Sequence, residues 1–298
     1  MSLQVSAAFV QQFSTNVQHL SQQKASRLRP AVRVELVKGE FAYFDQIGQV
    51  NMVERTSRHA DTPFTEIPQS RRRVGMRDFE ASEIIDSQDR ARMLVDPESY
   101  YVQAFAAAAG RRMDDEVIAA FFATAYTGKQ GTTAVTWPAG QVIAHDYVET
   151  GGATSSNLTI AKLRRAKELL DAADAGVDPD EPRYVACSSR EISFLLRSTE
   201  ITSADFNSIR ALVNGEVDTF MGFNFIRTER LALNGSSHRR VAAWVKSGLV
   251  LAIGEEPIAN VAADPTKGFN TRVHYKASFG ASRMEEAKVV EIVCNPTP

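Results

Sequence analysis

One long apolar stripe constrains the fold of this chain more than any other feature. Between Asp96 and Gly128, apolar residues recur at every fourth position, which places them on one face of a helix. Asp96 can cap the first turn, Pro97 suits the first helical position, and Gly128 suits a left-handed terminating position. We therefore predict a helix over about 96–126, roughly 45 Å long, that buries its stripe. The stripe consists of Tyr101, Phe105, Ala109, Met113, Val117, Phe121 and Ala125.

Composition and charge exclude several classes of protein. Of the 298 residues, 44% are hydrophobic and 23% charged, which allows one large domain or two or three smaller ones. The net charge of −2 does not mark a nucleic-acid or membrane binder. Cys187 and Cys294 are the only cysteines and lie far apart, which favours a reducing compartment. The N-terminus lacks the features of a secretion signal, and no apolar run of about eighteen residues predicts a membrane span.

Two segments before the long helix predict parts that cannot be stable alone. Residues 1–31 carry apolar residues near helical spacing among Gln and Ser, so we expect an arm that packs on the body, packs on a neighbouring subunit, or stays mobile until assembly. From Val32 the period changes to two, and residues 32–84 predict a long two-stranded ribbon with a polar tip at about 56–66. Such a ribbon is marginally stable in water, so we expect it to lie on a partner subunit.

The second half of the chain mixes helices and strands. A Gly- and Ser-rich stretch at 150–157 is the best linker candidate, and Asn157 or Thr159 can cap a following helix that Gly176 stops. Further helices are expected at 189–198 and 203–215, a strand at 182–188, strands or mixed segments of a packed core at 220–231 and 239–254, and two alternating runs at 271–295. Because strands and helices do not alternate strictly, the predicted fold class is α+β.

The search for catalytic or metal-binding motifs finds none. The five histidines are far apart in sequence, and none has a second His or Cys at ligand spacing: His19, His59, His145, His238 and His274. The stretch 127–132 looks like a phosphate loop, but Ala123 and Gln130 replace two required residues, so we interpret it as a helix terminator. Ser21 and Lys24 match a bare S-x-x-K pattern by chance. Cys187 is expected in the core, and we assign no catalytic, cofactor-binding or metal-ligating residue.

Arginines and acidic residues occur in short clusters. As single features these clusters are expected to be solvated faces. Taken together, they also suit a protein tiled against copies of itself, where charge fixes the register. The arginine clusters are Arg71–Arg73 with Arg77, Arg111–Arg112, Arg164–Arg165 and Arg239–Arg240, and the acidic ones are Asp114–Glu116, Asp178–Glu181, Glu255–Glu256 and Glu285–Glu286.

The order of these parts resembles the major capsid proteins of tailed bacteriophages, which share the HK97-like fold. The resemblance covers nearly the whole chain and is most specific at ADTPFTEIPQSRRR, at the stretch from IIDSQDRARMLVDPESYY into the long helix, and at DFNSIRALVNGEVDTFMGFNFIRTE. It implies an N-terminal arm over 1–31, an extended loop (E-loop) over 32–84, and a peripheral domain over 85–145. The peripheral domain would contain the spine helix at about 96–126 and be joined by strands from 240–298, and an axial domain would span 146–239.

The resemblance also implies a function and partners. The chain would be a structural subunit, without an active site or cofactor, that assembles through hexamers and pentamers into an icosahedral shell around phage DNA. Its partners would be copies of itself, a separate scaffolding protein, a portal and, in some phages, a decoration protein. Contact with packaged DNA would be non-specific, and no membrane partner is expected. The protein would lie in the virion capsid and be assembled in the cytoplasm of the bacterial host.

Three other functions compete with this interpretation. An encapsulin-type compartment would keep the fold but hold a cargo enzyme. An oligomeric enzyme could build its site between subunits from Asp, His and Ser of different segments, but no local motif supports it. A nucleic-acid-binding module is disfavoured by the near-neutral charge.

Overall fold

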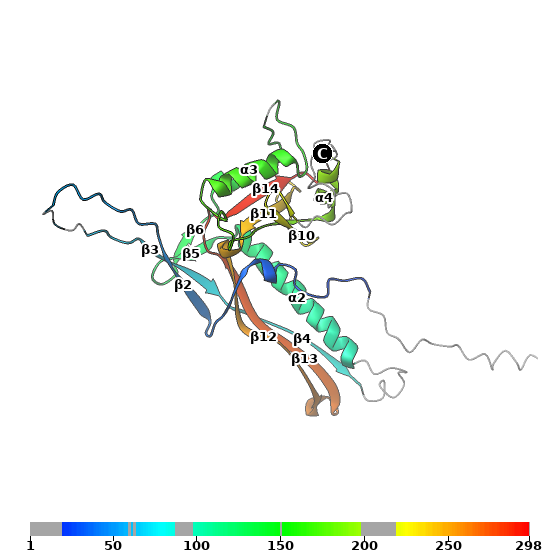
Figure 1. Cartoon of the computed structure of the whole chain (residues 1–298). Helices are drawn as coiled ribbons and strands as arrows, with labels where there is room; N and C mark the ends of the chain where they lie inside the picture. Colours follow the sequence, from blue (N-terminus) through cyan, green and yellow to red (C-terminus); the bar gives the residue numbers. More distant parts are fainter. Residues whose placement is uncertain are drawn as a thin grey trace, which may run out of the picture.

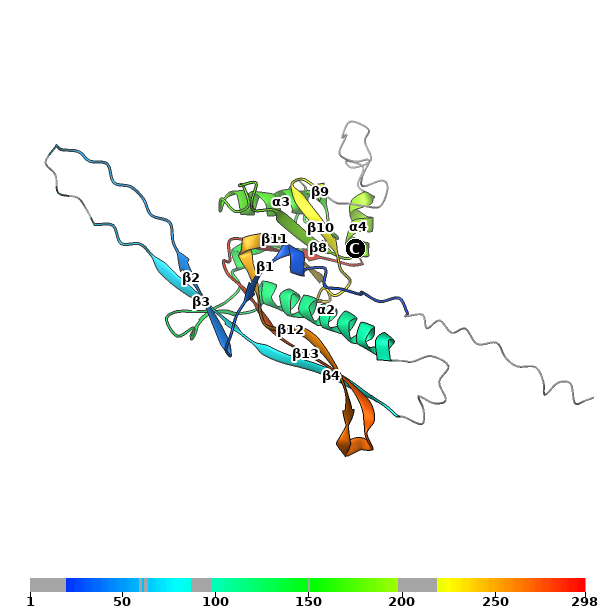
Figure 2. The same cartoon turned by 60° about the horizontal axis from the view of Figure 1, so that its bottom comes forward.

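The computed structural model describes residues 20–58, 61, 64–86, 98–149, 151–197 and 219–297. Three sheets and three helices make up most of this part of the chain (Figure 1). A ribbon extends from one side of the body, and the described beginning of the chain leaves on the other side (Figures 1 and 2). The expected helix at 203–215 and residues 1–19 of the arm lie outside the described residues.

A six-stranded sheet with adjoining helices forms one end of the body. Its strands, in spatial order, are β7 (Val142–Ile143), β14 (Val289–Cys294), β11 (Arg239–Val245), β8 (Arg183–Cys187), β10 (Phe223–Arg227) and β9 (Thr219–Phe220). The helices α3 (Ile160–Asp171) and α4 (Ser189–Leu196) belong to this end. Every residue of β14 is buried: the strand lies between β7 and β11, and α3 packs against it. Thr159, one of the two predicted caps, caps α3, and Ser188 and Glu191 form a capping box at α4.

A buried lysine holds α3 to its surroundings. The Lys162 ammonium group donates to the carbonyl oxygens of His145 (2.8 Å), Ser156 (2.8 Å), Asn157 (3.0 Å) and Val293 (3.1 Å). Burial disfavours the charged form and lowers the pKa of Lys162. Because the four carbonyl groups come from three separate segments, this one side chain ties the loop before α3 to the C-terminal strand.

The second sheet lies along the longest helix. Its order is β1 (Arg33–Leu36), β12 (Leu249–Asp264), β13 (Asn270–Arg283) and β4 (Arg77–Ile85), and α2 (Glu98–Phe122) packs against β12 and β13. The pairing corrects the expected ribbon over 32–84, because β1 joins β12 in parallel and β4 joins β13. Only the segment between them leaves the body. The strands β12 and β13 form a hairpin that extends past the end of α2 (Figure 2).

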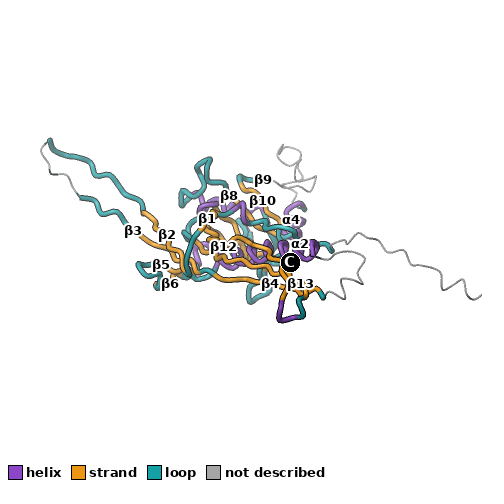
Figure 3. The backbone as a smooth tube through the Cα atoms, turned by 90° about the horizontal axis from the view of Figure 1, so that it is seen from below, coloured by secondary structure: helices purple, strands orange, loops and turns teal. Residues whose placement is uncertain are grey.

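The ribbon begins in a third sheet. Its order is β2 (Phe41–Ile47), β3 (Gln69–Gly75), β5 (Ala125–Thr127) and β6 (Thr133–Val135). The described residues of the connection between β2 and β3, 48–58, 61 and 64–68, extend beyond the sheet (Figure 3). Short 3₁₀ helices complete the described elements: η2 (Arg29–Ala31), η3 (Ala139–Gln141), η5 (Lys246–Gly248) and η6 (Pro265–Lys267).

The long helix is present but ends earlier than predicted. Ala125 and Tyr126 lie in β5, not in α2, and Gly128 forms a turn with Gly131 between β5 and β6, not a helix terminator. The fully buried Arg283 explains the early end, because its guanidinium group donates to the carbonyl oxygens of Phe121 (2.8 Å) and Ala123 (2.9 Å). The expected cap Asp96 and Pro97 lie outside the described residues.

Only half of the predicted stripe of α2 is in the core. Met113, Val117 and Phe121 are buried, and the Phe121 ring lies 4.7 Å from that of Trp244. Phe105, expected in the core, is only half-buried and lines a surface groove. The N-terminal half of the helix therefore has apolar surface that the described residues do not cover.

The end of the chain does not return as a whole to the sheet along α2. The strands β12 and β13 lie in that sheet, whereas β11 and β14 pair with each other and β11 pairs with β8. A boundary at residue 240, as expected from the sequence, would cut through the six-stranded sheet.

Candidate assembly surfaces

The described part of the arm is fixed to α2 by one buried carboxylate. Asp114 accepts hydrogen bonds from the backbone N–H groups of Arg27 (3.0 Å) and Leu28 (3.1 Å), from the Ser26 hydroxyl group (2.6 Å) and from the Gln23 side chain. Asp114 is fully buried, so these donors replace the water that its charge has lost. The arm after Gln23 is therefore a fixed part of the body.

Gly110 allows the arm to approach the helix closely. A Cβ atom at this position would lie 2.7 Å from the backbone nitrogen of Ser26, which no side chain tolerates. The next residue, Arg111, donates to the Gln22 side chain (2.9 Å) and the Gln23 carbonyl oxygen (3.0 Å). Within the described part of the arm, Leu20 is 89% exposed and so does not extend these contacts.

The base of the ribbon is clamped by Arg72. Its guanidinium group pairs with Glu286 (2.6 and 2.8 Å) and donates to the carbonyl oxygen of Met284 (2.8 Å), which also accepts from Gln46. Arg72 is nearly buried in this arrangement. The neighbouring Arg73 lies over the ring of Tyr126 at 4.8 Å. The ribbon thus leaves the body from a fixed base.

Towards the tip, the ribbon exposes apolar side chains without a partner in the described structure. Met52 and Phe64 are fully exposed. Such exposure is common for single residues, but a group on one projecting segment marks an interaction site. The exposed apolar side chains of the connection between β2 and β3 are Val50, Met52, Val53, Phe64 and Ile67, and the β12–β13 hairpin adds Ile258, Val261 and Phe269.

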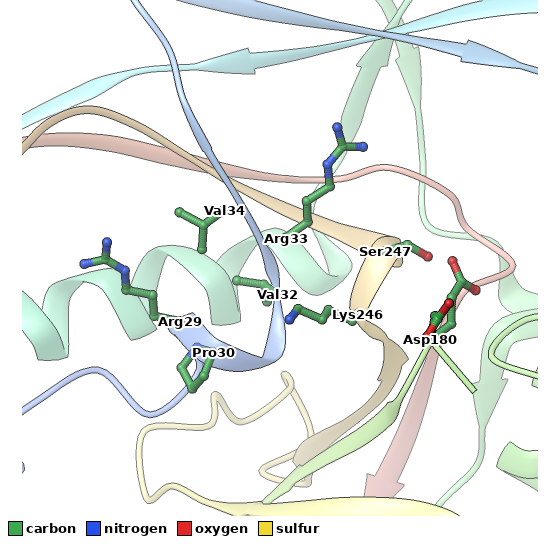
Figure 4. A pocket seen from close by; sticks show the side chains of 9 residues that line it. Arg29, Pro30, Val32, Arg33, Val34, Asp180, Lys246 and Ser247 are labelled. Carbon is green, nitrogen blue, oxygen red and sulfur yellow. The ribbon is translucent and has the colours of Figure 1, made fainter. Parts of the chain in front are cut away.

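An open strand edge lies near a surface pocket. Among the described residues β1 pairs only with β12, and a pocket of about 700 Å³ lies at the beginning of β1, where Arg33 and Val34 line it (Figure 4). Arg33 and Lys246 contribute positive charge to its walls, and Asp180 and Glu181 contribute negative charge. A free edge with room beside it can receive an extended segment of another chain.

The arginine clusters are used mainly within the chain. Arg71 pairs with Asp45, Arg112 with Glu116, Arg164 with Glu149, Arg165 with Glu168, Arg239 with Glu191, and Arg240 with Glu291. The hydrogen bond from Arg71 holds the pKa of Asp45 below its usual value. The expectation that these clusters fix the register between copies is thus not supported by their contacts, because acids of the same chain already neutralise them.

The residues tested for chemistry do not form a site. His145 and His238 face each other with ring centroids 4.3 Å apart, and His274 contacts Glu80, while His19 and His59 lie outside the described residues. Within the described ranges, no group of three or more His, Cys, Asp or Glu side chains could hold a metal ion. In the same ranges, no helix is both long and apolar enough to cross a membrane. Ser21 and Lys24 lie on the arm, away from the core.

Both cysteines are core residues, as expected for Cys187. Burial raises the pKa of the Cys187 thiol, and it raises the pKa of Cys294 to about 12. A protonated thiol is a poor nucleophile, so neither residue suits covalent catalysis.

Sequence reasoning missed the two carboxylates that fix the extensions, Asp114 and Glu286, because it treated them as members of acidic clusters. One signal was available for Asp114. Gly110 is an isolated glycine inside a strong helical pattern, and such a glycine often marks a close backbone approach. No comparable signal identifies Glu286.

Known capsid structures share this arrangement over almost the whole chain. The capsid structure of the cyanophage P-SCSP1u superposes with a TM-score of 0.74 at 17% identity, covering 98% of this chain and 94% of that chain. The head structure of Helicobacter pylori bacteriophage KHP40 superposes with a TM-score of 0.73 at 9% identity, covering 99% of this chain and 98% of that chain. The capsid of Ralstonia phage GP4 superposes with a TM-score of 0.72 at 12% identity, covering 97% of this chain and 97% of that chain. The fold is therefore the HK97-like capsid fold, of the α+β class predicted from the sequence.

The family follows from the sequence itself. A profile described as phage capsid protein matches residues 5–295, so the chain belongs to the phage capsid protein family. No curated protein matches the sequence. The predicted resemblance to phage major capsid proteins is confirmed. The chain is a structural major capsid protein of an icosahedral shell, which places it in the virion and makes copies of itself its partners.

Proposed function

We propose that this protein assembles through hexamers and pentamers into a shell around phage DNA, with the ribbon of each copy lying across the next copy. The exposed apolar side chains of the ribbon tip carry this proposal, since they have no partner in the described part of the chain. Contact with DNA would be non-specific. The six-stranded sheet would be the axial domain at the capsomer centre, and the sheet along α2 the peripheral domain.

The directions of the two extensions support a ring. The ribbon leaves the body on the side opposite to the described part of the arm (Figures 1 and 2). A subunit that contacts its neighbours through two different surfaces forms head-to-tail interfaces, and these close into rings when the rotation permits. Hexamers and pentamers are rings of this kind.

Further partners follow from the same proposal. A separate scaffolding protein and a portal would guide assembly in the cytoplasm of the bacterial host, and a decoration protein would bind the outside in some phages. No enzymatic activity is proposed, because the family and the fold give the chain a structural role.

Deleting residues 54–66 tests the proposal. The deletion removes the far end of the ribbon but leaves the Arg72 clamp, so the subunit should stay folded by circular dichroism and fail to close shells in electron micrographs. Phe64→Asp should weaken shell closure, whereas Ser57→Asp, a matched change at another exposed position of the ribbon tip, should not. Normal particles from the deletion would exclude the proposed role of the ribbon.

A cellular compartment with the same fold is the second candidate. Its interior would hold a cargo enzyme instead of DNA. Particles purified from a producing host distinguish the two, since packaged DNA protected from nuclease supports a phage shell and a co-purifying enzyme supports a compartment.

A further inference from the structure

Arg283, at the end of β13, has two buried hydrogen-bond donors that the chain does not use. The side chain is fully buried, and its Nη1 group donates to the carbonyl oxygens of Phe121 and Ala123. Its Nε and Nη2 groups are buried as well, but they have no hydrogen-bond acceptor among the described residues. Because a buried donor without an acceptor costs free energy, these two groups indicate a bound species that is not part of the chain.

The same two donor groups bind carboxylates elsewhere in this protein. In three other arginines, both Nε and Nη2 donate to a single acidic side chain. The pairs are Arg71 with Asp45, Arg230 with Asp115, and Arg240 with Glu291. The two N–H groups point to the same side of the planar guanidinium group, so they form a fork that suits an anion. In Arg283 this fork is buried and lacks its carboxylate.

The charge beside the fork is not balanced within the described part of the chain. A carboxylate oxygen of Glu286 lies 3.5 Å from Nε of Arg283, but both oxygens of Glu286 accept hydrogen bonds from Nη2 of Arg72 (2.6 and 2.8 Å). Two nearly buried guanidinium groups therefore share one negative charge. The carbonyl groups at the end of α2 compensate part of the charge of Arg283, but they contact only Nη1.

This imbalance favours an anion over a water molecule. Water would satisfy the two donors of the fork, but it would leave the excess positive charge in place. An anion satisfies the donors and also balances the charge, which matters most where solvent is excluded. The ring of Trp137 contributes to that exclusion, because the guanidinium carbon of Arg283 lies 4.7 Å from its centroid.

We propose that the fork of Arg283, beside Arg72 and Glu286, is a binding site for a small monovalent anion such as chloride. The anion is small because the donor atoms are buried, and chloride is monatomic. It enters beside Glu286, whose side chain keeps 24% of its surface exposed. The site lies within one subunit, so it goes beyond the proposed function and does not depend on shell formation.

An anion at this position connects three parts of the subunit. Arg283 holds the end of α2, Arg72 belongs to the base of the ribbon, and Glu286 lies in the turn between β13 and β14. A ligand that binds only the folded state stabilises it by mass action. Chloride should therefore stabilise the subunit and, with it, the base of the ribbon.

Crystals of the full-length subunit grown with bromide in place of chloride test the position of the anion. Bromide is a close substitute for chloride and is identified by its anomalous scattering. We expect an anomalous peak within hydrogen-bond distance of both Nε and Nη2 of Arg283. Density at the fork without an anomalous signal would identify a water molecule and overturn the proposal.

Urea unfolding in solution tests the binding itself. Chloride is replaced by gluconate at equal ionic strength, and the unfolding midpoint of the native subunit should rise with the chloride concentration. Arg283→Met removes the fork and should abolish this dependence. Arg230→Met removes a fork that Asp115 already occupies, so it should retain the dependence. The same chloride dependence in all three proteins would disprove the site.

Glu286→Gln provides a test in which Arg283 is kept. This change preserves the shape of the side chain but removes the negative charge that repels an anion from the fork. The chloride Kd from the same titration should fall at least about tenfold. Asp115→Asn is the matched control, because it removes the acid from the partly exposed fork of Arg230 and should leave the Kd unchanged. An unchanged Kd in Glu286→Gln would overturn the proposal, even if Arg283→Met does not fold.

Discussion

Arg72 and Glu286 join the base of the ribbon to the turn between β13 and β14, with a guanidinium nitrogen 2.6 Å from a carboxylate oxygen. The two residues are 214 positions apart in the chain. Arg72 is almost without solvent contact, whereas the Glu286 side chain keeps 24% of its surface exposed. The direction in which the ribbon leaves the body therefore depends on a contact that only the complete chain can make.

Removing this carboxylate should destabilise the ribbon base. In Glu286→Ala the nearly buried guanidinium group loses its charged partner, and we expect the free energy of unfolding to fall by about 2 kcal/mol. Urea denaturation followed by circular dichroism measures the change. Asp45→Ala removes the exposed partner of Arg71 and should cost less than about 1 kcal/mol. An equal decrease in the free energy of unfolding in the two variants would show that the pair of Arg72 and Glu286 stabilises the fold no more than an exposed ion pair does.

The arm should come loose when Asp114 is changed. Asn at this position keeps one acceptor oxygen but places an amide donor against backbone N–H groups. We therefore expect the free energy of unfolding to fall by about 2 kcal/mol. Limited trypsin digestion should then cut after Lys24 and Arg27, which the native contacts protect. Asp115→Asn, which affects only the pair with Arg230, is the control and should leave these sites protected.

The two thiols should resist alkylation in the folded subunit. The pKa of Cys294 is raised to about 12, against about 8.5 for a free thiol. Near pH 8 the thiolate fraction, and with it the rate, should be on the order of a thousandfold lower than in denaturant. Mass spectrometry after iodoacetamide treatment gives the comparison. Rapid modification of the native protein would contradict the buried positions.

The same shift predicts a direction for stability at alkaline pH. The pKa of Cys294 is higher in the folded state than in the unfolded state, so the folded chain keeps the thiol proton up to a higher pH. The resulting contribution to the free energy of unfolding is complete below about pH 8.5. It should be lost as pH rises from there towards 12. The lowered pKa of Lys162 acts in the opposite sense, so the test is the difference between the native protein and Cys294→Ala. The variant should lose less stability over this range.

Two positions of the α2 stripe should respond differently to a charge. Phe121→Asp places a carboxylate in the core beside Trp244, costs more than about 4 kcal/mol and should abolish folding. Phe105→Asp places the carboxylate in the open groove. We expect this subunit to fold, with a free energy of unfolding that is lower by less than about 2 kcal/mol. Soluble yield and circular dichroism compare the two. If neither variant folds, the groove is not open in solution.

Periodicity predicted the elements whose faces are buried by this chain. The helices at Glu98–Phe122, Ile160–Asp171 and Ser189–Leu196 and the strand Arg183–Cys187 follow from local spacing and caps. The pairing of β1 with β12 did not follow, since no local pattern encodes a partner two hundred residues away. The early end of α2 depends on Arg283, which is 162 positions from Phe121 in the sequence.

The sequence likewise predicted some features of the arm, the ribbon and the groove and missed others. The sequence predicted that the arm and ribbon need support from outside themselves, because neither has enough apolar residues for a core. It did not predict Asp114 or Arg72 as anchors, since a buried ion pair or a carboxylate that accepts backbone hydrogen bonds looks like any surface charge in a sequence. The groove beside Phe105 was also missed, because a regular stripe does not say how much of its length is covered.

The parallel pairing of β1 with β12 has a consequence for synthesis. Strand β1 leaves the ribosome early, but its partner begins at Leu249 and the neighbouring sheet closes only with β14 at Val289–Cys294. At about 5–20 residues per second, translation of the whole chain takes roughly 15 to 60 seconds. For most of that time the nascent polypeptide lacks both finished sheets. Prematurely terminated products therefore lack the folded body of a subunit, and we expect them not to be incorporated into the shell.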